Sequence, residues 1–138
     1  MLIDLESLFS DGQTPTLTHA AATDSTNTLD WRAHGDDIDK VLRLCVISTV
    51  AAASANGTAT MAIAWLTSAN GTDWTTLRTW TAFTVAQMTA GVILINNEQL
   101  PAGLLRYNKL TYTLAVEALS TGPKLTAFVS PADNFITR

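Results

Sequence analysis

The sequence is poor in charged residues. Only 14% of its 138 residues are charged, whereas an average domain has about 25%. Eight lysines and arginines are scattered singly along the chain and are outnumbered by twelve acidic residues, which gives a net charge of −4. Proteins that bind nucleic acid need clustered basic side chains to displace counterions from phosphates. The sequence therefore argues against a nucleic-acid partner.

Long apolar runs and cysteine pairs are also missing. No stretch approaches the ~18 consecutive apolar residues that a membrane-spanning helix requires, so we expect no membrane partner. Asp4 and Glu6 stand where an export signal carries basic residues, so we expect no export signal. The single cysteine, Cys45, excludes an internal disulfide. It lies in the apolar run Val41–Ile47, which predicts a buried, unreactive thiol.

Familiar catalytic and metal-binding motifs are absent as well. His19 and His34 are far apart and have no metal-ligand spacing, so we expect both in surface loops. The acidic cluster Asp36–Asp39 lacks the pattern of a calcium loop and is interpreted as solvated. No Gly-x-Ser-x-Gly occurs. We therefore expect a binding protein without catalysis, cofactor or metal; a hydrolase is the least favoured alternative.

What the chain does have is strand-forming sequence. Between Lys109 and Glu117, apolar side chains fall on every second position and polar ones between them, which predicts a strand with one apolar face. The apolar face continues beyond the Gly122–Pro123 break. We expect a long antiparallel hairpin over residues 104–129, whose apolar face requires a second sheet to cover it. The apolar positions are Leu110, Tyr112, Leu114, Val116, Leu125, Ala127 and Val129.

The pentapeptide Ser-Ala-Asn-Gly-Thr occurs twice, at residues 54–58 and 68–72. Asn-Gly is a strong hairpin signal because a tight turn needs positive φ at both central positions. Two such turns predict a three-stranded meander over residues 41–80. Both copies also match the N-glycosylation pattern, but the turn explains them sufficiently.

These patterns predict a single all-β domain, an antiparallel jelly roll or β-sandwich of roughly eight strands over residues 14–138. Residues 82–90 are left open between a loop and one helical turn. The expected strands cover residues 14–18, 27–31, 41–51, 58–67, 74–80, 91–95, 104–116 and 124–129.

Residues 1–13 are expected to form a short N-terminal arm. Leu2, Leu5, Leu8 and Phe9 have the spacing of a short helical stripe, although so short a helix is not stable alone. Two interpretations stand side by side. The segment either packs on its own sandwich or docks on a neighbouring subunit, where Leu5, Leu8 and Phe9 would anchor it.

Several residues have the composition of a binding surface. Trp74, Arg78 and Trp80 fall on one side of an expected strand, and Trp and Arg are enriched in interface hot spots; alternatively, both indoles pack under a loop of their own domain. The run Gly91–Ile95 is apolar on both sides, which predicts cover on both faces by a second layer or a partner. Trp65 is expected in the core. The candidate interface residues are Leu5, Leu8, Phe9, Trp74, Arg78, Trp80, Val92 and Leu94.

Both ends of the chain resemble a known family. The matching stretches near the N-terminus are residues 4–13 and 28–30; those near the C-terminus are Leu100–Gly103, Arg106-Tyr107, Tyr112–Leu114 and the Thr121-Gly122 break before Thr126–Val129. They resemble the jelly-roll capsid cement (decoration) proteins of short-tailed bacteriophages, of the Bordetella-phage type. The middle, roughly residues 31–90, carries no resemblance.

The resemblance implies a protein made in the host cytoplasm and placed on the outer capsid surface of the virion. There it would bridge subunits of the major capsid protein and stabilise the shell. Capsid symmetry favours a homodimer or homotrimer. The alternative from another class is a carbohydrate- or receptor-binding β-sandwich of a phage tail or fibre, in which Trp74 and Trp80 would stack on sugars.

Overall fold

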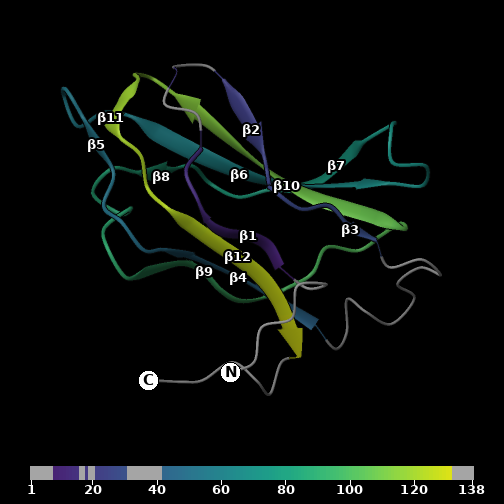
Figure 1. The fold of residues 1–138 in the computed structure, drawn as a ribbon. Helices are drawn as coiled ribbons and strands as arrows, with labels where there is room; N and C mark the ends of the chain where they lie inside the picture. Colours follow the sequence, from purple (N-terminus) through teal and green to yellow (C-terminus); the bar gives the residue numbers. More distant parts are fainter. Residues whose placement is uncertain (1–7, 16–17, 19–20, 31–41, 132–138) are drawn as a thin grey trace.

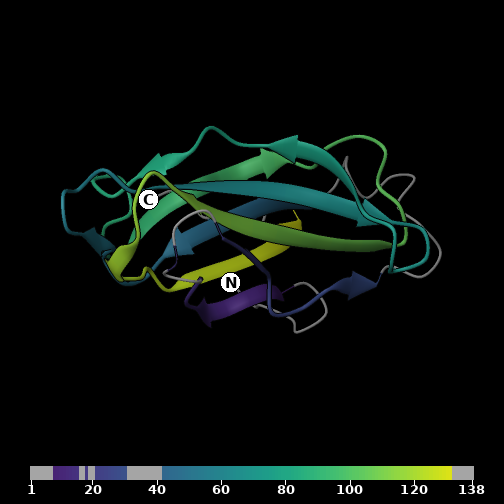
Figure 2. The same ribbon diagram turned by 90° about the horizontal axis from the view of Figure 1, so that it is seen from above.

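The computed structural model describes residues 8–15, 18, 21–30 and 42–131. The described residues form strands and loops and contain no helix. Two antiparallel sheets lie face to face as two layers (Figures 1 and 2). The all-β sandwich expected from the sequence is therefore confirmed. Leu5, His19, His34 and the acidic cluster at 36–39 lie outside the described residues.

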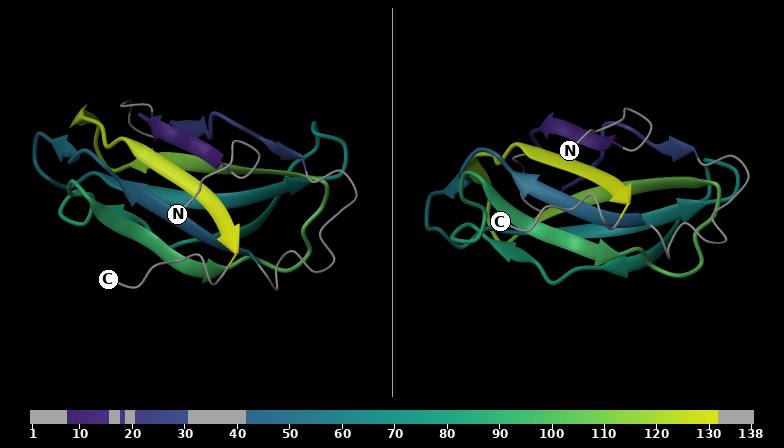
Figure 3. Two further views of the ribbon diagram at one scale, coloured as in Figure 1. Left: turned by 60° about the horizontal axis from the view of Figure 1, so that its bottom comes forward. Right: turned by 90° about the horizontal axis from the view of Figure 1, so that it is seen from below.

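The first sheet has four strands in the order β1-β12-β4-β9, which Figure 3 shows from below. Their bounds are β1 Leu8–Gln13, β12 Leu125–Pro131, β4 Leu42–Ser48 and β9 Val92–Gln99. In the second sheet, β10 and β6 form the centre; β2 and β3 pair with the outer side of β10, and β7 and β8 with the outer side of β6. These strands are β2 Ala22–Asp24, β3 Leu29–Asp30, β6 Thr60–Ser68, β7 Thr75–Thr79, β8 Phe83–Thr84 and β10 Tyr107–Ala115. A short pair, β5 (Ala53–Ser54) and β11 (Leu119–Thr121), lies at one end (Figure 1).

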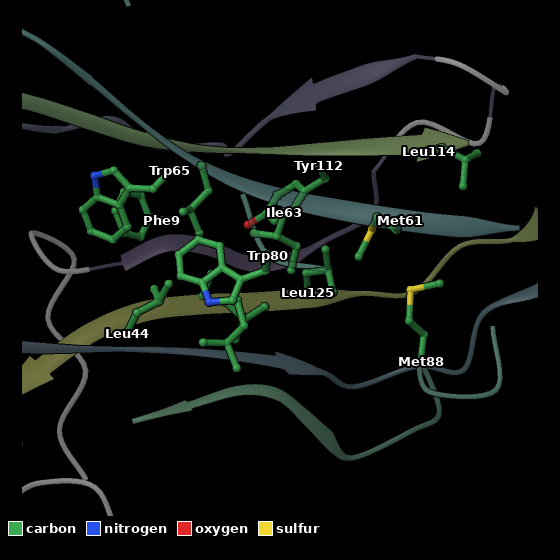
Figure 4. Packing of buried hydrophobic residues seen from close by; sticks show 14 of the residues in the cluster. Phe9, Leu44, Met61, Ile63, Trp65, Trp80, Met88, Tyr112, Leu114 and Leu125 are labelled. Atoms are coloured by element: carbon green, nitrogen blue, oxygen red, sulfur yellow. The ribbon is translucent and has the colours of Figure 1, made fainter. Parts of the chain in front are cut away.

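The core lies between the sheets and follows the predicted alternation. In β10, every second residue is buried, and each pairs with a buried residue of β6. Trp65 is fully buried, as expected. The first sheet covers these residues with Leu44, Val46 and the apolar face of β12 (Figure 4). The paired residues are Leu110 with Trp65, Tyr112 with Ile63 and Leu114 with Met61.

The long hairpin predicted over residues 104–129 is wrong. β10 belongs to the second sheet and β12 to the first, so the chain crosses between the layers instead of turning back on itself. Both strands still bury one apolar face in the common core. Val116, placed on that face by its spacing, lies beyond the end of β10, is 61% exposed and has φ of 76°. Spacing predicted which side chains point inward but not which sheet each strand joins.

The predicted meander is correct only for its second turn. Residues 68–72 close a hairpin between β6 and β7, whereas residues 54–58 lie on the connection from β4 in the first sheet to β6 in the second. In both turns only the glycine has positive φ, 70° at Gly57 and 81° at Gly71. The expected positive φ at both central residues is therefore wrong.

The described part of the expected arm is strand β1. It pairs with β12 as the edge of the first sheet, so residues 8–13 belong to the sandwich and form no helical stripe. Phe9 is fully buried, and its ring meets that of Trp65 edge-on at 5.1 Å (Figure 4). Leu8 is buried on the other face of the sheet with Cys45 and Phe128. The strand expected at residues 14–18 is wrong for its described residues, because β1 ends at Gln13 and residues 14, 15 and 18 belong to no strand.

Candidate docking surface along strand β9

The edge of the first sheet at β9 exposes apolar side chains and an unpaired strand. β9 pairs with β4 on one side, and among the described residues no strand pairs with its other side. β9 extends to Gln99, beyond the strand expected at residues 91–95. An unpaired strand edge presents backbone N–H and C=O groups in a row, which is a template for pairing with another chain.

The side chains on this edge are apolar and accessible. Ile93 is 48% exposed, and Val92 and Leu94 are half-buried. The prediction that this run is covered on both faces is therefore wrong within the single chain, although Ile95 is buried in the core. Of the two kinds of cover predicted from the sequence, a second layer or a partner protein, the partner is the one that remains.

A pocket of about 290 Å³ lies beside these residues. One wall is β9, and the other is the β8 region of the second sheet, so the pocket lies where the edges of the two layers meet. We call the whole area the β9 patch. Its lining residues are Phe83, Ala86, Gln87, Thr89, Val92, Ile93 and Leu94.

The wall opposite β9 is held by a compact turn. The backbone N–H of Thr84 donates to Gln87 Oε1 at 2.9 Å, and the N–H of Gln87 donates to Thr84 Oγ1 at 3.3 Å. This reciprocal pattern is that of a capping box. The N–H of Met88 donates to the carbonyl of Thr84 at 3.1 Å, and Met88 is buried below (Figure 4). The single turn left open for residues 82–90 is present as a hydrogen-bonded turn without a helix.

The lining of the β9 patch carries no charged side chain. The nearest ion pair joins the two sheet edges: Arg78 of β7 donates to Glu98 of β9 at 3.2 Å, and both side chains are about 40% exposed. The guanidinium of Arg78 also lies 4.6 Å from the centre of the Trp80 ring. A partner at this patch therefore has to be neutral and apolar where it contacts Val92, Ile93 and Leu94.

The two tryptophans predicted to share a surface are separated in the fold. Trp80 is 8% exposed and points into the space between the sheets (Figure 4), and its indole N–H has no acceptor among the described residues. Trp74 is half-buried, and the ammonium of Lys109 lies 4.4 Å from its ring centre while pairing with Asp24 at 3.0 Å. The indoles do not form a joint sugar-stacking platform, because Trp80 follows the end of β7 and its ring is buried in the core.

Of the other expected interface residues, Leu8 and Phe9 are buried within the domain. Cys45 is buried as expected, and burial raises the pKa of its thiol to about 11. Sequence reasoning chose Val92 and Leu94 but missed Ile93, the most exposed of the three. The signal was available, because the run Gly91–Ile95 is apolar at successive positions and Ile93 was as strong a candidate as its neighbours.

A second arrangement, missed from the sequence, is centred on Glu117. Its carboxylate accepts hydrogen bonds from Ser54 Oγ at 2.6 Å, from the Thr58 N–H at 2.8 Å, and from Thr58 Oγ1 and both nitrogens of Asn56. These bonds, that of Ser54 first and that of the Thr58 N–H second, lower the pKa of Glu117 to about 2. Donors surround the carboxylate, so it acts as an acceptor that fixes the 54–58 turn and not as a metal ligand.

No group of three or more metal-ligating side chains comes together among the described residues. Within the same residues, none forms a helix that is long and apolar enough to cross a membrane.

One comparison with known protein families gives a match that covers nearly the whole sandwich. A family model described as Bbp16 matches residues 9–129, from the second residue of β1 to within the last strand. A search of the curated proteins found no match.

Proposed function

This chain belongs to the Bbp16 family, and on that premise we propose that it is a capsid cement protein of a bacteriophage. It binds the outside of the head, bridges subunits of the major capsid protein and stabilises the shell. It acts by binding alone, without catalysis, cofactor or metal. The observation that carries the proposal is the β9 patch, an uncharged, apolar strand edge on an otherwise complete sandwich.

The order of the strands supports the finer assignment to a jelly roll. The chain supplies one strand to the first sheet and then one or two strand positions to the second, where β2 and β3 share one position beside β10 and β7 and β8 share one beside β6. Neighbours within a sheet, such as β1 and β12, are therefore far apart in sequence. Eight strand positions in two four-position sheets with this crossed order make two interlocked Greek keys, an arrangement common among viral capsid proteins.

Binding at the β9 patch would stabilise the assembled shell by mass action. A protein that binds only the assembled state lowers the free energy of that state by RT ln(1 + L/Kd), where L is its free concentration. The patch presents Ile93 and an adjoining pocket to an apolar segment of the partner. In the proposed assembly the chain also associates with itself as a dimer or trimer, because a symmetric shell repeats each binding site about its axes.

The test is binding to heads assembled without this protein, measured by co-sedimentation. We expect Ile93→Asp to weaken binding by roughly tenfold or more, because a buried, unpaired carboxylate is costly at an apolar contact. Ile93 is half exposed in the isolated chain, so we expect the variant to fold normally. Val116→Asp is the matched control, since it places the same carboxylate on an even more exposed β-branched residue outside the patch.

Normal binding by Ile93→Asp, with its melting temperature unchanged, would rule out the β9 patch as the contact. Failure of the wild-type protein to bind heads at all would rule out the cement function. Light scattering of the free protein tests self-association separately.

A further inference from the structure

The two copies of Ser-Ala-Asn-Gly-Thr have identical sequences but different surroundings. In the second copy the side chain of Asn70 is held at both ends. Its Oδ1 accepts from Ser68 Oγ at 3.0 Å and from the N–H groups of Thr72 and Asp73 at 2.8 and 2.9 Å, and its Nδ2 donates to Asp73 Oδ2 at 2.9 Å. The N–H of the following Gly71 is also engaged, donating to Ser68 Oγ at 2.8 Å.

In the first copy the corresponding groups are freer. Asn56 and Gly57 are both exposed. Asn56 Nδ2 donates to Glu117 Oε2 at 3.2 Å, but its Oδ1 accepts no hydrogen bond from the described residues. The N–H of Gly57 makes one long bond, 3.3 Å, to the carbonyl of Ser54. No atom lies within 4 Å of where a Cβ would stand on Gly57, whereas the ring of Tyr107 packs at 3.7 Å on Gly71.

We propose that Asn56 is a site of spontaneous deamidation and that the folded structure directs this modification to Asn56 and away from Asn70. The backbone nitrogen of Gly57 loses its proton and attacks the side-chain carbonyl carbon of Asn56. A C–N bond forms, the Cγ–Nδ2 bond breaks, and Nδ2 takes up a proton in place of the one that Gly57 lost and leaves as ammonia. Water then opens the cyclic imide at either carbonyl and gives aspartate or isoaspartate at position 56.

The hydrogen bonds explain the selectivity. Attack requires a free glycine nitrogen and a side-chain carbonyl that rotates toward it. At Asn70 the structure opposes both requirements, because five hydrogen bonds have to be released first: that of the Gly71 N–H, three to Asn70 Oδ1 and one from Asn70 Nδ2. Each such bond contributes to holding the unreactive geometry. At Asn56 one long bond and one side-chain bond to Glu117 have to give way.

The modification has a structural consequence at Glu117. A carboxylate at position 56 would face the Glu117 carboxylate, which now accepts from Asn56 Nδ2 at 3.2 Å. Two like charges in this position repel each other. Isoaspartate also lengthens the backbone and shifts the N–H groups of Asn56 and Thr58 that donate to Glu117. Deamidation therefore releases the 54–58 turn and strains β5, which ends at Ser54.

The direct test is to age the folded, full-length protein in mildly alkaline buffer and follow both asparagines by peptide mass spectrometry. We expect Asn56 to convert roughly tenfold or more faster than Asn70, because the protected site is held by three additional hydrogen bonds. The chain supplies its own control: in denaturant, the two identical pentapeptides are expected to convert at similar rates. Equal rates in the folded protein, faster conversion of Asn70, or protection of both sites would overturn the proposal.

A variant tests the reason for the selectivity. Ser68→Ala removes the acceptor of the Gly71 N–H and one donor to Asn70 Oδ1, so we expect Asn70 to convert several-fold faster while Asn56 is unchanged. An unchanged rate at Asn70 would contradict the mechanism of protection.

The consequence is tested with Asn56→Asp in two backgrounds, using hydrogen exchange over residues 53–58. We expect faster exchange in the wild-type background and a much smaller effect in Glu117→Gln, because the repulsion needs both carboxylates. Equal effects in both backgrounds would show that repulsion from Glu117 is not the cause.

Discussion

Replacing Phe9 with alanine decides whether the N-terminal segment is an arm or a strand. The Phe9 side chain is fully buried and packs edge-on against Trp65 at 5.1 Å. Truncating a buried phenylalanine costs about 3–5 kcal/mol because it removes apolar burial and leaves a cavity. A domain of this size has a stability of about 5–15 kcal/mol, so Phe9→Ala removes a large part of it. The corresponding fall in melting temperature is roughly 10–20 °C.

The measurement is urea denaturation together with a thermal melt followed by circular dichroism. Phe9→Leu is the control, because it keeps most of the apolar volume, and we expect it to lose less than half as much stability. An unchanged slope of the unfolding free energy against urea concentration would show that the variant still unfolds as one unit. If Phe9→Ala melted like the wild type, β1 would not be part of the sandwich, and the segment would be an arm as the sequence suggested.

Three further predictions concern single side chains. Tyr112→Phe removes the hydroxyl group that hydrogen-bonds to Ser10 Oγ at 2.8 Å in the core. We expect urea denaturation to report a loss of about 1–2 kcal/mol in the free energy of unfolding; no loss would mean that the bond is replaced by water. Glu117 has its pKa lowered from 4.5 to about 2, so its stabilising effect is complete above pH 4.5 and disappears as pH falls toward 2. In melts across this range, the wild type should exceed Glu117→Gln above pH 4.5 and converge with it in acid; a constant difference would contradict the assignment. Val116→Asn should raise the free energy of unfolding by about 1 kcal/mol, because a β-branched residue at φ of 76° is strained and asparagine tolerates this region; a destabilised variant in the same denaturation assay would refute the strain.

Local patterns predicted the strands far better than their partners. The alternation at Leu110, Tyr112 and Leu114 correctly placed these residues in the core, because side-chain direction depends only on the strand itself. Whether β10 and β12 form a hairpin depends instead on the connection between them. That connection contains β11, which pairs with β5. No sequence pattern within residues 116–124 indicates that this segment pairs with a strand more than sixty residues earlier.

The repeated pentapeptide shows the same limit at the level of a turn. Identical residues close a hairpin at Asn70 and link two sheets at Asn56. The difference lies in the acceptor and donor groups outside the repeat. Asp73 and the Asn70 side chain complete the local turn, whereas Glu117, about sixty residues away in sequence, organises the other. Glu117 could not be chosen from the sequence, because any acid in a loop after a strand has the same local appearance.

The run at residues 91–95 bears most directly on function. It was expected to be covered on both faces by a second layer or by a partner, and within the described chain Ile93 remains 48% exposed and β9 forms a sheet edge. Proteins that act as free monomers protect such edges with charged residues or proline, and the run Val92–Ile95 contains neither. Cover by a partner stays a prediction. If the cover comes from a second protein, an acidic residue at position 93 has to weaken assembly while leaving the isolated domain as stable as before.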